Sequence, residues 1–153
     1  MKNLIMLSVL LFGFTFIASG QKDAPEVVKK VFAQKYAAAK SVKWVNESAN
    51  EWEAEFTLNG KEMSAAYDNT GKWLETETEV AIKDLPAAVT TTLSKDFAGY
   101  KTGETSAVEN PEMKGFEIAL KKGETALEVV IDANGKVLKN TAVSKKVEKE
   151  EKK

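Results

Sequence analysis

The apolar side chains of the sequence recur first with a helical period and then with the period of a strand. Val28, Val31, Phe32 and Tyr36 are spaced as on one buried face of a helix. From Trp52 to Leu58, apolar and polar residues alternate, which is typical of a strand with one buried face. The pattern therefore predicts a helix that packs against a sheet.

Turn signals divide the alternating region into separate strands. Asn59-Gly60 is the strongest short signal for a tight hairpin. The segment Asp68–Lys72 predicts a second turn, in which Gly71 can take a positive φ. The predicted strands are residues 52–58, 63–67 and 73–80, and a shorter strand at residues 41–45 precedes them.

The same order of elements returns in the second half of the chain. Asp23-Ala-Pro25 recurs as Asp84-Leu-Pro86 at an offset of 61 positions, and later residues such as Trp52 and Phe116 match at an offset of 64. The offset changes near a loop at residues 109–115, as expected for a duplicated unit. Residues 21–83 and 84–144 are thus predicted to be two repeats. The strands of the second repeat are predicted at residues 102–108, 116–121, 127–131 and 137–143.

Each repeat is predicted to open with a capped helix. Asp23 and Asp84 are the expected N-caps, and a proline lies in the first turn, where its missing N–H costs nothing. In the first repeat, Glu26 would complete a capping box.

The two ends of the chain are predicted to lie outside the fold. Residues 1–20 combine Lys2, an apolar run and the small residues Ala18-Ser19-Gly20, which is typical of a cleaved secretory signal peptide. The run is short for a membrane-spanning helix, so no stable membrane insertion is expected after cleavage. Residues 145–153 have eight charged residues in nine and are predicted to be a charged, disordered tail. The mature protein is expected to be periplasmic or secreted.

The composition excludes most catalytic chemistry. The chain has no histidine and no cysteine, and every basic residue is lysine. Disulfides, thiolate or imidazole metal sites and histidine-assisted nucleophiles are therefore impossible. No cofactor and no catalytic residue is expected, although paired carboxylates such as Glu53 and Glu75 could in principle act on a glycoside. The formal net charge of −1 argues against nucleic acid as a partner.

Two rows of glutamates are the strongest candidate for a binding surface. Side chains two positions apart on a strand share a face, so residues 51, 53 and 55 form one row and residues 75, 77 and 79 form another. A solvated sheet face that resists aggregation is the simpler interpretation. The alternative is a docking face for a basic protein or for Ca²⁺, although these strands lack the ligand loop that calcium prefers. The candidate partner-binding residues are Lys43, Glu53, Glu55, Trp73, Glu75, Glu77 and Glu79.

The chain combines several short motifs. They are the Asp-x-Pro helix start, Val42-x-Trp44, Trp52-x-Ala-x-Phe56 and Tyr67-Asp68-x-x-Gly71-Lys72-Trp73, with a second set that includes Ile131-Asp132-x-x-Gly135-Lys136. Together these motifs resemble those of the PepSY-like family. The second set departs from the aromatic pattern, with Thr105 in place of Trp44 and Val137 in place of Trp73.

The resemblance implies an α+β fold similar to the beta-lactamase inhibitor protein. In this fold, two tandem α-β-β-β(-β) repeats form one curved antiparallel sheet, with a helix from each repeat on one face. Members are small exported bacterial proteins, common in Bacteroidetes, and the family supplies no catalytic residues. The expected function is a monomeric, non-catalytic module that binds an envelope protein, such as a peptidase, through the open sheet face. The alternative is a sensor or carrier that holds a small ligand between sheet and helices.

Overall fold

The computed structural model describes residues 23–143, so the predicted signal peptide and charged tail lie outside the described residues. Its elements are α1 (Glu26–Lys35), β1 (Lys40–Ser48), β2 (Glu51–Leu58), β3 (Lys61–Asp68), β4 (Trp73–Glu79), the 3₁₀ helix η1 (Ile82–Asp84), α2 (Ala87–Asp96), β5 (Lys101–Glu109), β6 (Lys114–Lys122), β7 (Thr125–Ile131) and β8 (Val137–Ala142). The strands form an antiparallel open sheet in sequence order, from β1 to β8. The predicted α+β architecture is therefore confirmed, although β1 is longer than the strand expected at residues 41–45.

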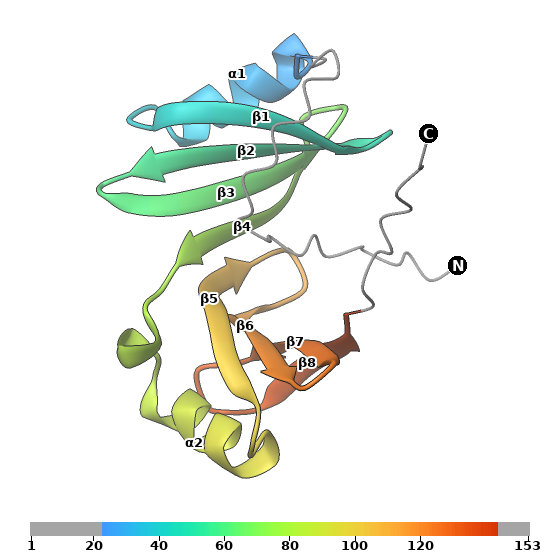
Figure 1. The fold of residues 1–153 in the computed structure, drawn as a ribbon. Helices are drawn as coiled ribbons and strands as arrows, with labels where there is room; N and C mark the ends of the chain where they lie inside the picture. The colour runs from blue at the N-terminus through green and yellow to red at the C-terminus, as the bar shows by residue number, and fades with distance from the viewer. Residues whose placement is uncertain (1–22, 144–153) are drawn as a thin grey trace, which may run out of the picture. The chain divides into compact units, whose positions relative to one another are not determined.

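The described chain divides into two compact units. Unit 1 contains residues 23–79 together with 109–112, and unit 2 contains residues 80–108 and 113–143. Each unit has one α-helix and four strands, in the same order (Figure 1). Within the described residues, neither α-helix is long and apolar enough to cross a membrane.

Unit 1 has a core of aromatic side chains between α1 and the sheet. Phe32 of α1 contacts Phe56 of β2 with ring centroids 5.0 Å apart, and Tyr36 lies 4.7 Å from the same ring. Trp44 of β1 meets Phe32 edge-on at 5.4 Å. The apolar stripe predicted for the helix is therefore the face that packs on the strands, and the rings fill the space between the two layers.

Two tyrosines of this core differ in how their hydroxyl groups are satisfied. The Tyr36 hydroxyl lies 2.7 Å from Thr76 Oγ1. Tyr67 of β3 is fully buried, and its hydroxyl has no hydrogen-bond partner among the described residues. Burial raises the pKa of Tyr67 above its ordinary value, because the phenolate would lose its hydration.

The β2–β3 hairpin has the register that its turn predicts. Leu58 pairs with Lys61, so Asn59 and Gly60 form a two-residue loop. Both residues have positive φ, 53° and 78°, as a type I′ turn requires. The pairing continues without a shift to Glu51 and Asp68, so the whole alternation of β2 stays in phase with β3.

The turn between β3 and β4 is closed by Asp68 and touches the helix. Asp68 Oδ1 accepts hydrogen bonds from the backbone N–H groups of Thr70 and Lys72, at 2.8 and 3.0 Å. The Thr70 hydroxyl also donates to Asp68 Oδ1, at 2.6 Å. This bond, and then the two backbone bonds, lower the pKa of Asp68. At Gly71, a Cβ atom would lie 3.2 Å from the Val31 side chain and 3.3 Å from a backbone oxygen of α1. The glycine therefore permits close approach as well as a φ of 85°.

Unit 2 repeats this construction with a core that is mostly aliphatic. The buried residues of its core cluster are Leu85, Val89, Phe97, Ile118, Leu120, Val129 and Ile131. Asp132 closes the β7–β8 turn through bonds from the backbone N–H groups of Asn134 and Lys136. The Thr92 hydroxyl of α2 donates to the Gly135 carbonyl at 2.6 Å, which fastens the turn to the helix.

The predicted helix caps are wrong. The N-cap residues are Pro25 and Pro86, and neither helix start has a side-chain cap hydrogen bond. Asp84 lies in η1, two residues before the N-cap position of α2.

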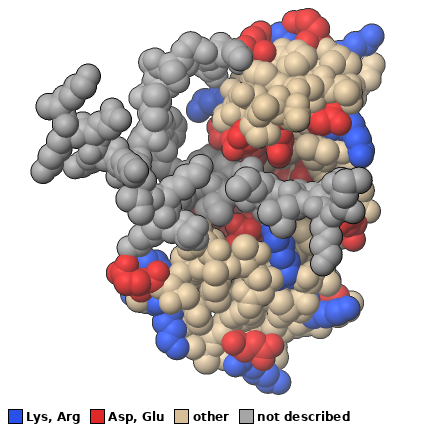
Figure 2. All heavy atoms as spheres, turned by 90° about the vertical axis from the view of Figure 1, so that its right-hand side faces the viewer, with Lys and Arg blue, Asp and Glu red and all other residues tan. Residues whose placement is uncertain are grey.

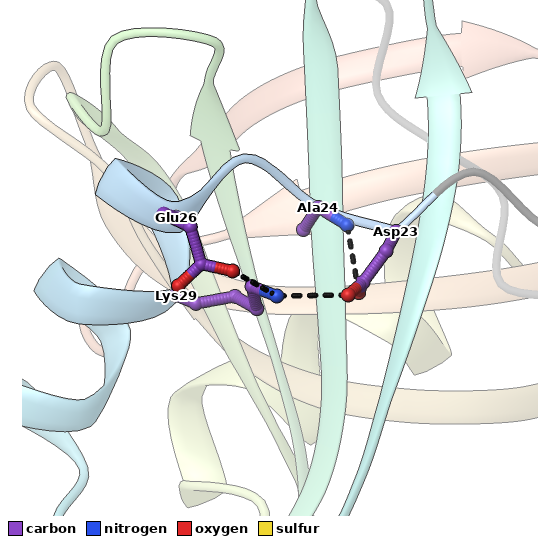
Figure 3. Close-up of polar contacts among 4 residues, drawn as sticks. All are labelled: Asp23, Ala24, Glu26 and Lys29. Carbon is purple, nitrogen blue, oxygen red and sulfur yellow. Dashed lines mark hydrogen bonds and ion pairs between the residues drawn. The ribbon is translucent and has the colours of Figure 1, made fainter.

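Asp23 and Glu26 instead share a lysine (Figure 3). Lys29 Nζ lies 2.8 Å from Asp23 Oδ2 and 2.6 Å from Glu26 Oε1. Asp23 also accepts a bond from the Ala24 N–H at 3.0 Å. The bond from Lys29 lowers the pKa of Asp23, and the bond to Asp23 raises that of Lys29. The acidic residues at the helix entry therefore pair with Lys29 and do not cap the backbone.

Candidate functional site

The glutamate rows lie on the side of the unit 1 sheet opposite the helix. In β2, Trp52, Ala54 and Phe56 belong to the core under α1. Because successive side chains of a strand point to opposite faces, Glu51, Glu53 and Glu55 lie on the other face. In β4, Thr76 contacts Tyr36 on the helix side, which places Glu75 and Glu77 on the face away from it. This set of residues on β2, β3 and β4 is called the acidic face below. On the face drawn in Figure 2, acidic side chains lie at several separate places, with lysines among them.

Small residues of β3 separate the two glutamate rows. Glu53 pairs with Ala66, which pairs with Glu75. Glu55 pairs with Ser64, which pairs with Glu77. Because neighbouring strands lie about 4.8 Å apart, the two rows run about 10 Å from each other across short side chains. The acidic face thus has two parallel lines of carboxylates. Glu53 and Ser64 are buried, and Glu55, Ala66, Glu75 and Glu77 are half-buried.

Lys43 and Glu79 are the predicted binding residues at the ends of the strands. Lys43 of β1 is exposed and pairs with Glu55, so it lies at the edge of the acidic face. Glu79 is the exposed last residue of β4.

The prediction that Trp73 lies beside the glutamates is wrong. A register shift after Ala66 pairs Trp73 with Tyr67, which turns its side chain to the helix side. There Lys35 Nζ lies 4.1 Å from the Trp73 ring centroid, and Trp73 Nε1 donates to Thr76 Oγ1 at 2.9 Å. The bulge changes the phase of β4 at its first residue, and the sequence pattern carries no signal for it.

Glu53 is the least exposed carboxylate of the face. Only 5% of its surface is accessible. Burial raises its pKa to about 7, and the carboxylates of Glu47, Glu55 and Glu51 act in the same direction. A hydrogen bond from the Ser64 hydroxyl opposes the shift, because it favours the charged form. Burial also raises the pKa of Glu51, with a further contribution from Glu47. A buried carboxyl group at the centre of a row therefore titrates near neutral pH.

The β5–β6 loop reaches the second row. Residues 109–112 of this loop belong to unit 1. Asn110 Nδ2 donates to Glu75 Oε2 at 2.8 Å, while its own Oδ1 accepts from the Glu112 N–H at 2.9 Å. The loop was expected from the change in repeat offset, but its contact with Glu75 was not. A single asparagine before a proline gives no sequence signal for such a contact.

The corresponding face of unit 2 carries mixed charge. The positions matching Glu53 and Glu75 are Glu117 and Lys139 at the offset of 64. Glu128, on the strand between them, lies 3.7 Å from Lys139 Nζ. Burial raises the pKa of Glu128, and the lysine partly offsets that effect. The two parallel carboxylate rows are therefore a feature of the first repeat alone.

Within residues 23–143, no cluster of acidic side chains has the arrangement of a metal site. The carboxylates of the acidic face lie along strands, where alternate side chains are about 7 Å apart, rather than around one point. The arrangement can hold several positive charges in a line. The small residues Ser64 and Ala66 were missed as parts of this surface, although the period-two pattern of β3 could have identified them.

Comparison with known proteins agrees with this architecture. Residues 50–139 match the family described as "Putative beta-lactamase-inhibitor-like, PepSY-like". No curated protein matches the sequence.

Three solved structures from Bacteroides share the fold. A BLIP-like protein from Bacteroides fragilis is 22% identical with a TM-score of 0.71, over 81% of this chain and 89% of that one. A DUF2874 family protein from Bacteroides ovatus is 22% identical with a TM-score of 0.72, over 84% and 94% of the two chains. A structure from Bacteroides eggerthii, titled "putative periplasmic proteins", is 20% identical with a TM-score of 0.70, over 80% and 91%. The family match spans more than half of the sequence, and the chain belongs to the PepSY-like, beta-lactamase-inhibitor-like family.

Proposed function

We propose that this protein is an exported, non-catalytic binding module whose acidic face holds a basic, extended segment of an envelope protein. The observation that carries the proposal is the pair of glutamate rows on β2 and β4, separated by Ser64 and Ala66. A lysine or arginine side chain placed over Ala66, which is half-buried, would lie between Glu53 and Glu75. Alternate side chains of an extended partner repeat every 7 Å or so, which matches the spacing along each row.

Charge and family both support a binding role. Carboxylates of one sign attract a basic partner and speed its association. The chain has no histidine or cysteine, and the family to which it belongs is described by resemblance to an inhibitor rather than to an enzyme. The apolar segment at residues 1–20 and the periplasmic description of one structural relative support an exported location.

The aromatic core favours this proposal over a carrier for a small ligand. In unit 1, the rings of Phe32, Tyr36 and Phe56 lie 4.7–5.3 Å from one another between α1 and the strands. A ligand held between these layers would have to displace them.

Charge reversal on the acidic face tests the proposal. The mature protein and a Glu75→Lys/Glu77→Lys variant are immobilised, and proteins captured from an envelope extract of the native host are identified by mass spectrometry. Asp84→Lys/Asp96→Lys makes the same change in net charge at exposed positions of unit 2 and is the matched control. The proposal predicts a basic partner that the wild type and the control retain, that the face variant loses, and that added salt releases. Equal capture by all three proteins would contradict it. Tryptophan fluorescence of each variant checks that unit 1 remains folded.

A further inference from the structure

The β2–β3 turn differs chemically from the other Asn-Gly pair of the chain. The sequence contains two such pairs, Asn59-Gly60 and Asn134-Gly135. An asparagine followed by glycine is prone to spontaneous deamidation, because no side chain hinders attack by the next backbone nitrogen. Identical chemistry in two structural settings makes each pair the reference for the other.

Asn59-Gly60 lies in an open, exposed turn. Both residues are exposed, and a Cβ atom on Gly60 would have no other atom within 4 Å. Within the described part of the chain, the Gly60 N–H donates to no acceptor. The attacking nitrogen is therefore accessible, and the turn can change its dihedral angles without displacing a neighbour.

Asn134-Gly135 is held from several sides. The Gly135 N–H donates to the Asp132 carbonyl at 2.9 Å, and the Asn134 N–H donates to Asp132 Oδ1 at 2.8 Å. The Gly135 carbonyl accepts from Thr92, and a Cβ on Gly135 would lie 2.8 Å from the Ala88 carbonyl oxygen. Attack by the Gly135 nitrogen requires this turn to leave α2 first, and such local opening costs free energy.

We propose that Asn59 is a self-modification site at which the folded protein deamidates, while Asn134 is protected by the docking of its turn on α2. The Gly60 nitrogen attacks Asn59 Cγ and forms a new C–N bond. The bond from Cγ to the side-chain nitrogen breaks, and the amide proton of Gly60 leaves with that nitrogen as ammonia. Water then opens the five-membered succinimide ring at either carbonyl. The products are aspartate or isoaspartate, without any oxidant, reductant or cofactor.

Both products alter the hairpin that carries the acidic face. Aspartate adds a negative charge at the tip of β2 and β3. Isoaspartate adds a methylene to the backbone, so the two-residue loop no longer matches the pairing of Leu58 with Lys61. A change of register in this hairpin would move Glu53 and Glu55 relative to Ser64. Deamidation at Asn59 therefore accumulates with time and alters the hairpin that carries the acidic face.

Peptide mapping of the aged full chain tests the proposal. Trypsin places the two asparagines in separate peptides, residues 44–61 and 123–136. The folded protein is incubated at mildly alkaline pH, and fragmentation spectra locate the conversion of amide to carboxyl. We expect Asn59 to react at least about tenfold faster than Asn134, a ratio equivalent to about 1.4 kcal/mol in activation free energy.

Two controls make the outcome decisive. In concentrated urea the two pairs should react at similar rates, because only the folded structure distinguishes them. Asn59→Gly should abolish the change in peptide 44–61 and keep the hairpin, because glycine also accepts a positive φ. Equal rates in the folded protein would overturn the proposal. So would an Asn59 that stays intact in the folded chain over a period in which it reacts in urea.

Discussion

Replacing Glu53 by glutamine should stabilise unit 1 in a pH-dependent way. In the folded protein Glu53 has a pKa of about 7, against an ordinary value of 4.5. The folded state therefore binds this proton more tightly than the unfolded state. Stability from this group is fully present below pH 4.5, and it falls as the pH rises through 7. At about 1.4 kcal/mol for each pH unit between the two values, the loss amounts to about 3 kcal/mol.

Glutamine keeps the shape of the side chain and removes the charge. The Ser64 hydroxyl can still donate to its amide oxygen, so the hydrogen bond that faces Glu53 survives. We expect Glu53→Gln to match the wild type at pH 4 and to exceed its free energy of unfolding by up to about 3 kcal/mol at pH 8. Glu62→Gln, on the exposed part of β3, is the control, and a surface change of this kind should stay within about 0.5 kcal/mol.

Urea unfolding followed by tryptophan fluorescence measures this effect in the correct unit. All three tryptophans of the chain, Trp44, Trp52 and Trp73, belong to unit 1. Comparing variants at each pH cancels the titration of the groups that do not interact with Glu53. A difference between Glu53→Gln and wild type that stays constant from pH 4 to pH 8 would refute the reasoning, as would a variant that is less stable at pH 8.

Three further changes probe the packing of each unit. Tyr67→Phe should leave the free energy of unfolding unchanged or raise it by about 1 kcal/mol. Tyr36→Phe should lower it by about 1 kcal/mol, because only this change removes a satisfied hydrogen bond. Urea midpoints measured at one pH compare the two variants. Gly135→Ala should lower the free energy of unfolding by more than about 2 kcal/mol, since strain at positive φ adds to a clash with α2. Gly60→Ala should lower it by about 1 kcal/mol, because only the strain applies. Circular dichroism melting curves rank the two variants. Lys29→Met should destabilise the protein at low salt and have little effect at high salt, because its partners are exposed; a salt-independent loss would contradict an electrostatic role.

The periodic parts of the fold could be predicted from the sequence because burial of one face leaves a visible pattern. All eight strands and both helices lie where the apolar spacing and the turn signals place them. The Asn59-Gly60 hairpin was predictable for the same reason, since few residues other than asparagine and glycine accept its dihedral angles.

The features that the sequence did not predict depend on contacts between residues distant in the sequence. The bulge after Ala66 places Trp73 on the helix side, and nothing local announces it. The burial of Glu53 depends on its surroundings in the folded protein, so its raised pKa could not be read from an alternating strand. The failed prediction of the helix caps has a different cause. Asp23 is two residues too early to cap α1, because Pro25 takes the N-cap position.

The contacts of Gly71 with α1 and of Gly135 with α2 bear on the timing of folding during synthesis. In each unit the helix emerges first, and the turn that closes over it follows about 40 residues later, as in the bond from Thr92 to Gly135. Neither helix can make its contact with the glycine turn until that turn has left the ribosome. Unit 1 has all of its turn contacts before α2 is made, although its residues 109–112 come later. The order of synthesis therefore favours folding of the first repeat while the second is still being translated.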